Sequence, residues 1–136
     1  TERRLHLDEL PAPDAIRRLV EFTFDHHDHN SDFVRIVSIE NIHYGEYVKQ
    51  SPAIRQMSNV VLLTLGETLK RGEKEGLFRE GLDTLDVHML ISSFCFYRVS
   101  NRHTFGEIFQ IDLPDEQVKQ RHKTMICEAV LRYIMR

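Results

Sequence analysis

The sequence has few of the residues that interrupt regular secondary structure, with six glycines and four prolines among 136 residues. It also lacks any apolar run approaching the roughly 20 residues needed to cross a membrane, so no membrane partner is expected. The chain opens with the charged stretch Thr1-Glu2-Arg3-Arg4, which does not resemble a secretory signal peptide. These absences favour a cytoplasmic protein. A first residue other than methionine suggests a piece of a longer chain.

Charge of one sign is not in excess either. The formal net charge is −3 and the pI is about 6.2, whereas a free-standing nucleic-acid binder usually shows a basic patch and a high pI. These residues alone are therefore not expected to bind DNA. The hydrophobic fraction of 41% and the charged fraction of 29% are ordinary for a globular protein, and the length suffices for one packed core.

Cysteine is scarce, and Cys95 and Cys127 each lie inside an apolar helical run. One disulfide bridge is an alternative, but buried thiols in a cytosolic protein are favoured. The sequence contains no nucleophile elbow, P-loop, dinucleotide fingerprint or paired zinc-ligand spacing. Ser92 and Ser93 lie in a predicted helix without an evident base. We therefore predict neither an enzyme nor a cofactor.

Apolar residues recur at helical spacing along nearly the whole chain, which predicts an all-α bundle of about five to six helices. After a charged segment at residues 2–10, the predicted helices are about 14–27, 32–49, 52–75, 84–100 and 115–136. Ser31 and Ser51-Pro52 are start signals for the second and third helices. Gly76 can end the third helix in the left-handed conformation, and Asp83 with Asp86 resembles a capping box for the fourth.

Two predicted helices near the C-terminus carry more apolar surface than one subunit can cover. Helix 84–100 is apolar on more than one face, and helix 115–136 has a three-four apolar stripe. A monomer would expose a contiguous apolar patch unless the first helices cover helix 84–100, which is the alternative. Pairing both helices with their two-fold mates gives a dimeric four-helix bundle, so we predict a homodimer. Its predicted interface residues are Phe94, Tyr97, His122, Met125, Ile126, Ala129, Val130 and Tyr133.

Three passages resemble the C-terminal domain of TetR-family transcriptional regulators, and the resemblance covers essentially the whole chain. The first is Ile39-Glu40-Asn41-Ile42-His43. In the second, Gly72-Glu73-Lys74-Glu75-Gly76-Leu77-Phe78-Arg79 followed by Leu82-Asp83 resembles the G-x-x-x-G-x-F-R turn before the first dimer helix. The third, Asn101-Arg102-His103-Thr104-Phe105 with Ile108-Phe109, resembles the segment that joins the two dimer helices in one subgroup.

The resemblance implies that residues 11–136 are an effector-binding and dimerisation domain, and that residues 1–10 are the tail of a connecting helix. That helix would lead to an N-terminal helix-turn-helix head, which is absent from this chain. Operator DNA would be bound only through the head. A small-molecule effector, partly apolar, would change the DNA affinity by binding two arrangements of the dimer unequally.

A ligand cavity in such a bundle would be walled by apolar and aromatic groups with a few polar ones. Helix 32–49 is apolar almost all round and is predicted to be largely enclosed. Glu40 and Asn41 interrupt it, so at least one of them is expected to be enclosed, and in a functional interpretation they would orient a polar ligand. Alternatively, one faces solvent and the other caps a neighbouring helix. The candidate ligand-binding residues are Phe22, Glu40, Asn41, Tyr44, Met57, Val61 and Phe96.

Histidines form the most conspicuous polar cluster, His26-His27-Asp28-His29. Metal binding needs imidazoles that converge at about 2.0–2.1 Å, and His26 and His29 would share a face if the helix continued. Because the helix is predicted to end before Asn30, a solvated turn is favoured and no metal is predicted. A helical metal-binding bundle that uses the His26–His29 turn is the alternative function.

Other polar residues receive structural interpretations. His88 and His122 are expected to be packed or interface histidines. Arg98, Asn101, Arg102 and His103 are expected to cap helix 84–100 and to hold the connecting segment through its carbonyls, with an anion site as the alternative.

Overall fold

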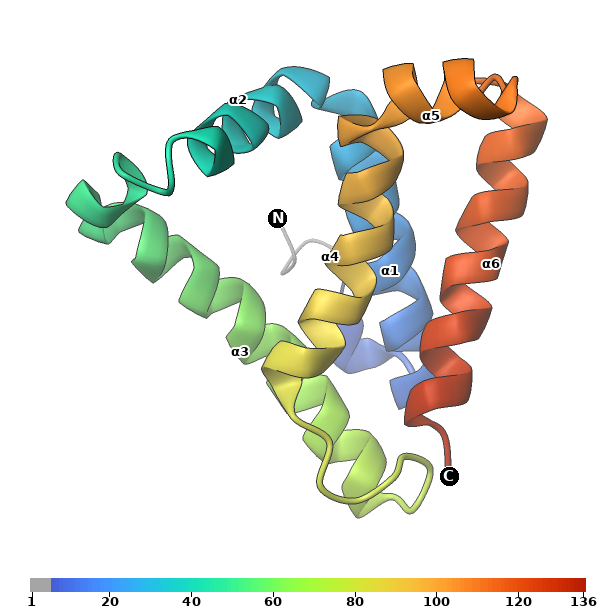
Figure 1. Ribbon diagram of the computed structural model, residues 1–136. Coiled ribbons are helices and arrows are strands. Elements are labelled where there is room, and N and C mark those ends of the chain that lie inside the picture. Colours follow the sequence, from blue (N-terminus) through green and yellow to red (C-terminus); the bar gives the residue numbers. More distant parts are fainter. Residues whose placement is uncertain (1–5) are drawn as a thin grey trace.

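A computed structural model describes residues 6–136, apart from the side chains of residues 55 and 57–61. The predicted all-α fold is confirmed. The helices are α1 (Ala12–His29), α2 (Ser31–Ile42), α3 (Pro52–Lys74), α4 (Thr84–Ser100), α5 (Arg102–Phe109) and α6 (Glu116–Ile134), with short 3-10 helices η2 (Leu7–Glu9) and η3 (Val48–Gln50). In Figure 1, α1, α4 and α6 lie together, α2 and α3 diverge on the other side of α4, and α5 crosses above α4 and α6. No helix of the described residues is both long and apolar enough to span a membrane.

The core lies where α1, α4 and α6 meet the C-terminal part of α3. Helix α1 contributes Ile16, Leu19, Val20 and Phe24, whose three-four spacing places them on one face. Helices α4 and α6 contribute stripes that include Ile91 and Ile126, and burying each such side chain stabilises the fold by about 1.5–3 kcal/mol. Cys95 and Cys127 are free and buried in this core, as predicted.

The turn between α3 and α4 depends on two glycines. Gly76 has a φ of +77°, which a side chain would disfavour, and α3 ends two residues earlier at Lys74. Phe78 is fully buried against Gly72, where an added Cβ would lie 2.1 Å from the phenyl Cδ2. The next amide, that of Arg79, donates to the Ile134 carbonyl at 2.8 Å. The turn therefore joins the end of α3 to the end of α6.

The first described residues pack against the bundle through Leu7 and Arg71. Leu7 is buried, and the Arg71 guanidinium of α3 donates to the carbonyls of Leu10 and Leu7, the latter at 3.0 Å. Residues 7–9 form η2, and residues 1–5 lie outside the described part of the chain. That residues 1–10 form the tail of a connecting helix stays a prediction.

The starts of α2 and α4 and the whole of α5 can be compared with the elements predicted from the sequence. Asp83 caps α4 by accepting a hydrogen bond from the Asp86 amide at 2.9 Å, as expected, and α4 has the predicted bounds. The prediction for Ser31 was wrong because Asn30 holds the N-cap position, and its side-chain amide donates to the His26 carbonyl at 2.7 Å. Residues 102–109, expected as a connecting segment, form α5.

The prediction of one enclosed helix over residues 32–49 was wrong. Helix α2 ends at Ile42, and Tyr44 and Gly45 then take positive φ angles of 58° and 72°. Of the residues in α2, Val34 is buried, whereas the apolar side chains around it, such as Ile36 at 64% exposure, face outward. An apolar sequence makes enclosure favourable, but the described chain supplies no further helix to cover this face.

Candidate functional site

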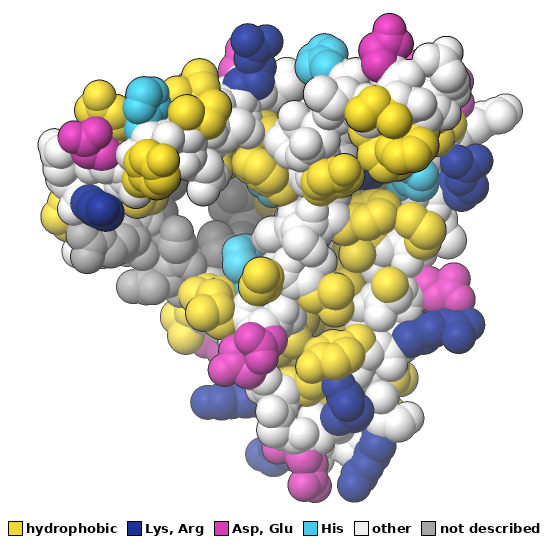
Figure 2. Space-filling model, in the orientation of Figure 1, with side chains coloured by type: hydrophobic (Ala, Val, Ile, Leu, Met, Phe, Trp, Pro, Cys, Tyr) yellow, Lys and Arg dark blue, Asp and Glu magenta, His cyan; other side chains and the backbone are white. Residues whose placement is uncertain are grey.

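One stripe of α4 forms the wall of a hollow between α2, α3 and α4. Thr84, His88, Ser92 and Phe96 are spaced four apart and therefore follow one side of the helix. At one end, the Thr84 hydroxyl lies 3.2 Å from where a Cβ on Gly66 of α3 would stand. At the other end, Phe96 contacts α1. By this spacing the middle of the stripe lies on the same side of α4 as these two contacts, and Figure 2 shows a hollow in the surface between α2 and α4. We call this space the α2–α4 hollow.

Aromatic and imidazole rings gather where the last turns of α1 approach α2 and α4. The His27 ring meets the Phe96 ring edge to face, with centroids 5.7 Å apart. The His26 ring stacks on Phe22 at 5.8 Å and meets Phe33 of α2 edge to face at 6.5 Å. These distances are those of favourable aromatic pairs. The cluster therefore joins three helices at the upper end of the α2–α4 hollow.

Three polar side chains lie in or next to the middle of this stripe, namely His88 and Ser92 of α4 and His27 of α1. His88 Nε2 lies 3.4 Å from the Ser92 hydroxyl one turn along α4. His27 Nδ1 is buried and has no hydrogen-bond partner among the described residues. Burial lowers the pKa of His27, and positive charge on His26 or His88 lowers it further, so the imidazole is held in its neutral form.

The structure brings only part of the predicted ligand-binding set to this cluster. Phe22 and Phe96 lie in it. Met57 and Val61 fall on α3 among the side chains outside the described part. The remaining predicted residues, Glu40, Asn41 and Tyr44, lie at the opposite end of α2 and do not reach the cluster.

Those three residues build the turn after α2. The Glu40 carboxylate accepts from the amides of Tyr47 and Val48 at 2.7 and 3.1 Å. The Asn41 side chain donates to the Val37 carbonyl at 3.0 Å, and Tyr44 is 89% exposed. From the sequence, these three residues were predicted to line the ligand cavity because the helix was expected to continue to about residue 49. Since α2 stops at Ile42, the carboxylate satisfies turn amides instead.

Sequence reasoning missed His27, His88 and Ser92 as hollow-facing groups. The signal was available: His88 and Ser92 are polar interruptions at i and i+4 in a helix that is otherwise apolar on several faces. His27 was considered only with its neighbours as a metal-binding turn. Among the described residues, no group of three or more His, Cys, Asp or Glu side chains could hold a metal ion. His26 Nδ1 instead lies 3.5 Å from the side-chain nitrogen of Asn30 in an exposed turn.

The predicted interface residues on α4 and α6 divide into two sets. Ile126 and Val130 are buried in the chain's own core, so they have no surface to offer a partner. The others lie outward on α4 and α6 and are exposed or half-buried: Phe94, Tyr97, His122, Met125, Ala129 and Tyr133. Figure 2 shows hydrophobic side chains gathered along these two helices. Helix α1 covers only the inner side of α4, since Met89 remains 70% exposed. We call this outward surface the α4–α6 face.

Arg98 crosses the core beneath the α4–α6 face. It is 6% exposed, and its guanidinium donates to His122 Nδ1 at 2.9 Å and to the Leu113 carbonyl at 2.7 Å. Asp28 of α1 lies 4.0 Å from the same group and 2.9 Å from Lys119 Nζ. Arg98 therefore holds the segment before α6, as predicted. It does so from inside the bundle, where a buried arginine needs such partners.

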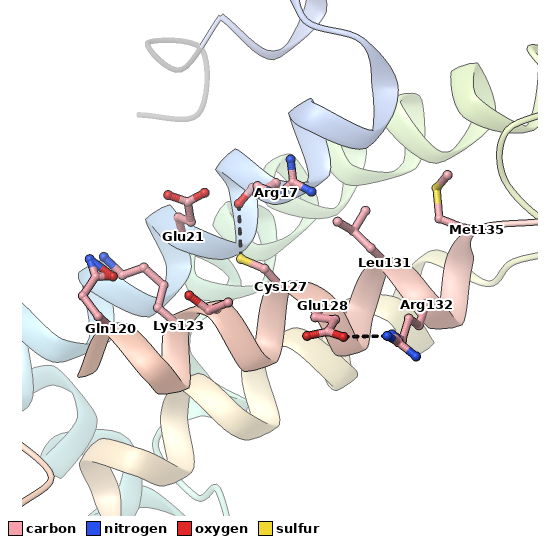
Figure 3. Close-up of a pocket in the computed structure, with 10 residues that line it drawn as sticks. Arg17, Glu21, Gln120, Lys123, Cys127, Glu128, Leu131, Arg132 and Met135 are labelled. Carbon is pink, nitrogen blue, oxygen red and sulfur yellow. Dashed lines mark hydrogen bonds and ion pairs between the residues drawn. The ribbon is translucent and has the colours of Figure 1, made fainter. Parts of the chain in front are cut away.

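A second concave surface lies between α1 and α6 (Figure 3). This groove of about 460 Å³ has Arg17 and Glu21 on one side and Lys123 and Arg132 on the other. At its floor, burial and the nearby Glu21 carboxylate raise the pKa of the Cys127 thiol to about 11. The thiol stays protonated at neutral pH and is a poor nucleophile. Charges of both signs line the groove, so it favours no ligand charge.

The comparisons with known proteins agree with this architecture. Residues 13–130 match the family described as "Tetracyclin repressor-like, C-terminal domain". A relative, the HTH-type transcriptional repressor NicS of Pseudomonas putida, is 33% identical over 135 residues, which cover 99% of this chain and 64% of the relative. The chain thus spans somewhat less than two thirds of the length of that repressor. The chain belongs to the TetR-type family of repressor C-terminal domains.

Proposed function

We propose that residues 11–136 are the effector-binding and dimerisation domain of a bacterial TetR-type transcriptional regulator that works in the cytoplasm. The observation that supports this proposal is that α4 contributes to two different surfaces of the domain. One side of α4 lines the α2–α4 hollow with His88 and Ser92, and the adjoining side presents Met89 and Tyr97 on the α4–α6 face. A ligand in the hollow would therefore contact a helix that also pairs with its two-fold mate.

Regulation would follow from this shared helix. A ligand shifts an equilibrium only between arrangements that it binds unequally, so moving α4 against its mate would link occupancy of the hollow to the geometry of the dimer. Two helix-turn-helix heads must fit half-sites about 34–36 Å apart, which makes DNA binding sensitive to small changes. The greater length of the relative and its HTH-type name support such a head before this domain. No catalytic step or cofactor is required.

The dimer is tested by the mass of the chain in solution. Light scattering at micromolar concentration should give about twice the chain mass of 16.1 kDa. Met125→Glu, on the α4–α6 face, should weaken the dimer at least about tenfold because an unpaired charge would be buried at the interface. Ile36→Glu is the matched control, because Ile36 is exposed on α2 away from this face. A monomer mass for the unchanged chain would contradict the proposal.

DNA control is tested on the longer regulator that contains the head. Ser92→Phe places a bulky ring in the α2–α4 hollow, whereas Thr104→Phe changes an exposed residue of α5. We expect the Ser92 variant to bind operator DNA but to lose its response to a cellular extract that releases the unchanged protein. Fluorescence anisotropy of labelled operator measures both. A full response in the Ser92 variant would argue against the hollow as effector site.

A further inference from the structure

Helix α5 carries an apolar stripe that the described part of the chain leaves largely uncovered. Phe105, Ile108 and Phe109 are spaced three and four apart and therefore lie on one side of the helix. We call these three residues the α5 stripe. Ile108 is 71% exposed and Phe109 is 64% exposed. A single exposed apolar residue is ordinary, but adjoining large ones form a patch whose burial against a partner would be favourable.

The α5 stripe continues an apolar row on α4. Leu85, Met89 and Tyr97 lie at multiples of four residues along α4, and each is at least half exposed. At the end of this row the Tyr97 ring meets Phe105 edge to face, with centroids 6.1 Å apart, and the Phe105 and Phe109 centroids are 4.7 Å apart. Figure 2 shows hydrophobic side chains over α5 on the same side of the molecule as those of α4 and α6. The apolar row therefore passes from the α4–α6 face onto α5.

The α4–α6 face alone lies at the lower limit for a stable dimer. A helix turns about three to four of every seven residues toward one side, so α4 and α6, with 17 and 19 residues, offer about 15–20 together. Specific interfaces take in about 20–30 residues from each partner. The exposed apolar side chains of α2 lie across α4 from this face (Figure 1). The adjoining apolar surface that could enlarge the interface is therefore the α5 stripe.

Contacts within the chain hold α5 in place, so the α5 stripe is a preformed surface. At the start of α5, the Phe105 amide donates to the Asn101 carbonyl at 2.8 Å. At its end, the Gln110 side chain donates to the Glu107 carbonyl at 2.6 Å. The following segment is held by the buried Arg98, which donates to the Leu113 carbonyl at 2.7 Å. A surface that is already ordered loses less conformational entropy when a partner binds.

We propose that α5 is part of the dimer interface, where Ile108 and Phe109 pack against a second copy of this chain. This inference rests on the proposed function, because it extends the surface through which the domain pairs with its two-fold mate. Under two-fold symmetry the patch occurs on both subunits, so each α5 that is buried adds to the interface twice. Aromatic anchors often contribute most of the binding free energy of an interface, which makes Phe109 the residue of largest expected effect.

The experiment measures the dimer dissociation constant of the 136-residue chain by analytical ultracentrifugation, with a carboxylate placed on either side of α5. Ile108→Glu and Phe109→Glu should each raise the dissociation constant at least about tenfold, because the charge would be buried without a partner. His103→Glu places the same group on the opposite, exposed side of α5 and should change the constant by less than about twofold. Met125→Glu is the positive control on the α4–α6 face.

A second measurement tests the burial of α5 directly, should a carboxylate variant fail to fold. Ile108→Cys and His103→Cys are compared for their rates of reaction with a maleimide, since the natural thiols of Cys95 and Cys127 are buried. In the dimer, the cysteine at position 108 should react at least about tenfold more slowly than the one at position 103. Dilution below the dissociation constant should remove the difference, because both positions are exposed in the single subunit.

The outcomes separate α5 from the rest of the interface. If Met125→Glu weakens the dimer while the Ile108 and Phe109 variants do not, the assignment of α5 is overturned and the dimer stands. The same holds if His103→Glu weakens the dimer equally, or if the two cysteine variants react at equal rates in the dimer. If the unchanged chain is a monomer, the dimerisation part of the proposed function fails and the assignment of α5 fails with it.

Discussion

The two sides of α4 contrast in how their apolar residues are covered. On one side, α1, α6 and the C-terminal part of α3 bury almost all the apolar side chains that face one another. On the other, α2 and η3 carry a comparable density of apolar residues, yet Val34 is the buried one among them. We call these the packed part and the open part. The contrast shows that the number of apolar residues determines how much surface would be stabilised by burial. Which of these residues are buried depends on which helices pack against them.

The contrast also bears on function. Regions with few buried contacts open at a lower free energy than the core, and ligand-responsive elements are drawn from them. The aromatic cluster of Phe33, His26 and Phe96 lies where the open part meets the packed part. We therefore expect the open part to respond to a ligand in the α2–α4 hollow, with α4 carrying the change to the α4–α6 face.

Truncating one phenylalanine to alanine in each part should give the largest difference in stability between the packed and the open part. Phe24 is 2% exposed and stacks under the Arg98 guanidinium, whereas Phe33 is 50% exposed. Phe24→Ala should lower the free energy of unfolding by about 3–5 kcal/mol, because it leaves a cavity in the core. Phe33→Ala should lower it by less than about 1 kcal/mol. Urea unfolding at one fixed protein concentration measures both, and equal losses would contradict the division into packed and open parts.

A smaller effect is expected from adding a methyl group to α3 inside the packed part. Gly72→Ala would place Cβ against the buried Phe78 ring and should destabilise by about 1–3 kcal/mol despite the better helix propensity of alanine. Gly66→Ala is the control in the same helix, since its Cβ would come no closer than 3.2 Å to the Thr84 hydroxyl and would meet the Thr84 methyl at an ordinary 3.7 Å. A stabilised Gly72 variant would show that Phe78 does not fit tightly on the helix.

The packed part was largely predictable from the sequence, and α4 illustrates why. Its start at Asp83 and its end at Ser100 are encoded locally by a capping carboxylate and by the span of the apolar run. The turn at Gly76 is likewise local. Resemblance to TetR-type domains then placed these helices in one arrangement, which the family match supports.

The candidate site was less predictable because it depends on which helix faces which. The apolar run of α2 predicted enclosure, but enclosure requires a neighbour that the sequence pattern does not identify. On α6, one apolar stripe was expected, whereas Ile126 and Val130 face the core and Met125 and Tyr133 face outward. These two rows of side chains lie next to each other on the helix. The spacing of the apolar residues therefore does not show which row faces the core, because that depends on where α1 packs.

Arg71 provides a local test of how the first described residues are held to the packed part. Arg71→Met keeps an apolar stem but removes the hydrogen bonds to the carbonyls of Leu7 and Leu10. The free energy of unfolding should fall by about 1–2 kcal/mol. Hydrogen exchange should accelerate at residues 7–10 more than in α4 or α6. Lys70→Met, an exposed neighbour, is the control, and unchanged exchange at residues 7–10 would show that Leu7 packing alone holds the segment.

Acid should weaken the packed part gradually, and this is the smallest effect expected. Burial lowers the pKa of His122, and the charges of Arg98 and Arg121 lower it further; His27 shifts in the same direction. Because the unfolded chain then takes up protons first, the stabilisation is complete above about pH 6.5 and is lost as the pH falls toward the folded pKa values. Each histidine adds at most about 1.4 kcal/mol per pH unit. His122→Gln can still accept from Arg98, so its urea midpoint should fall less between pH 7.5 and 5.5. A midpoint that rises in acid would mean that these imidazoles are favoured as cations.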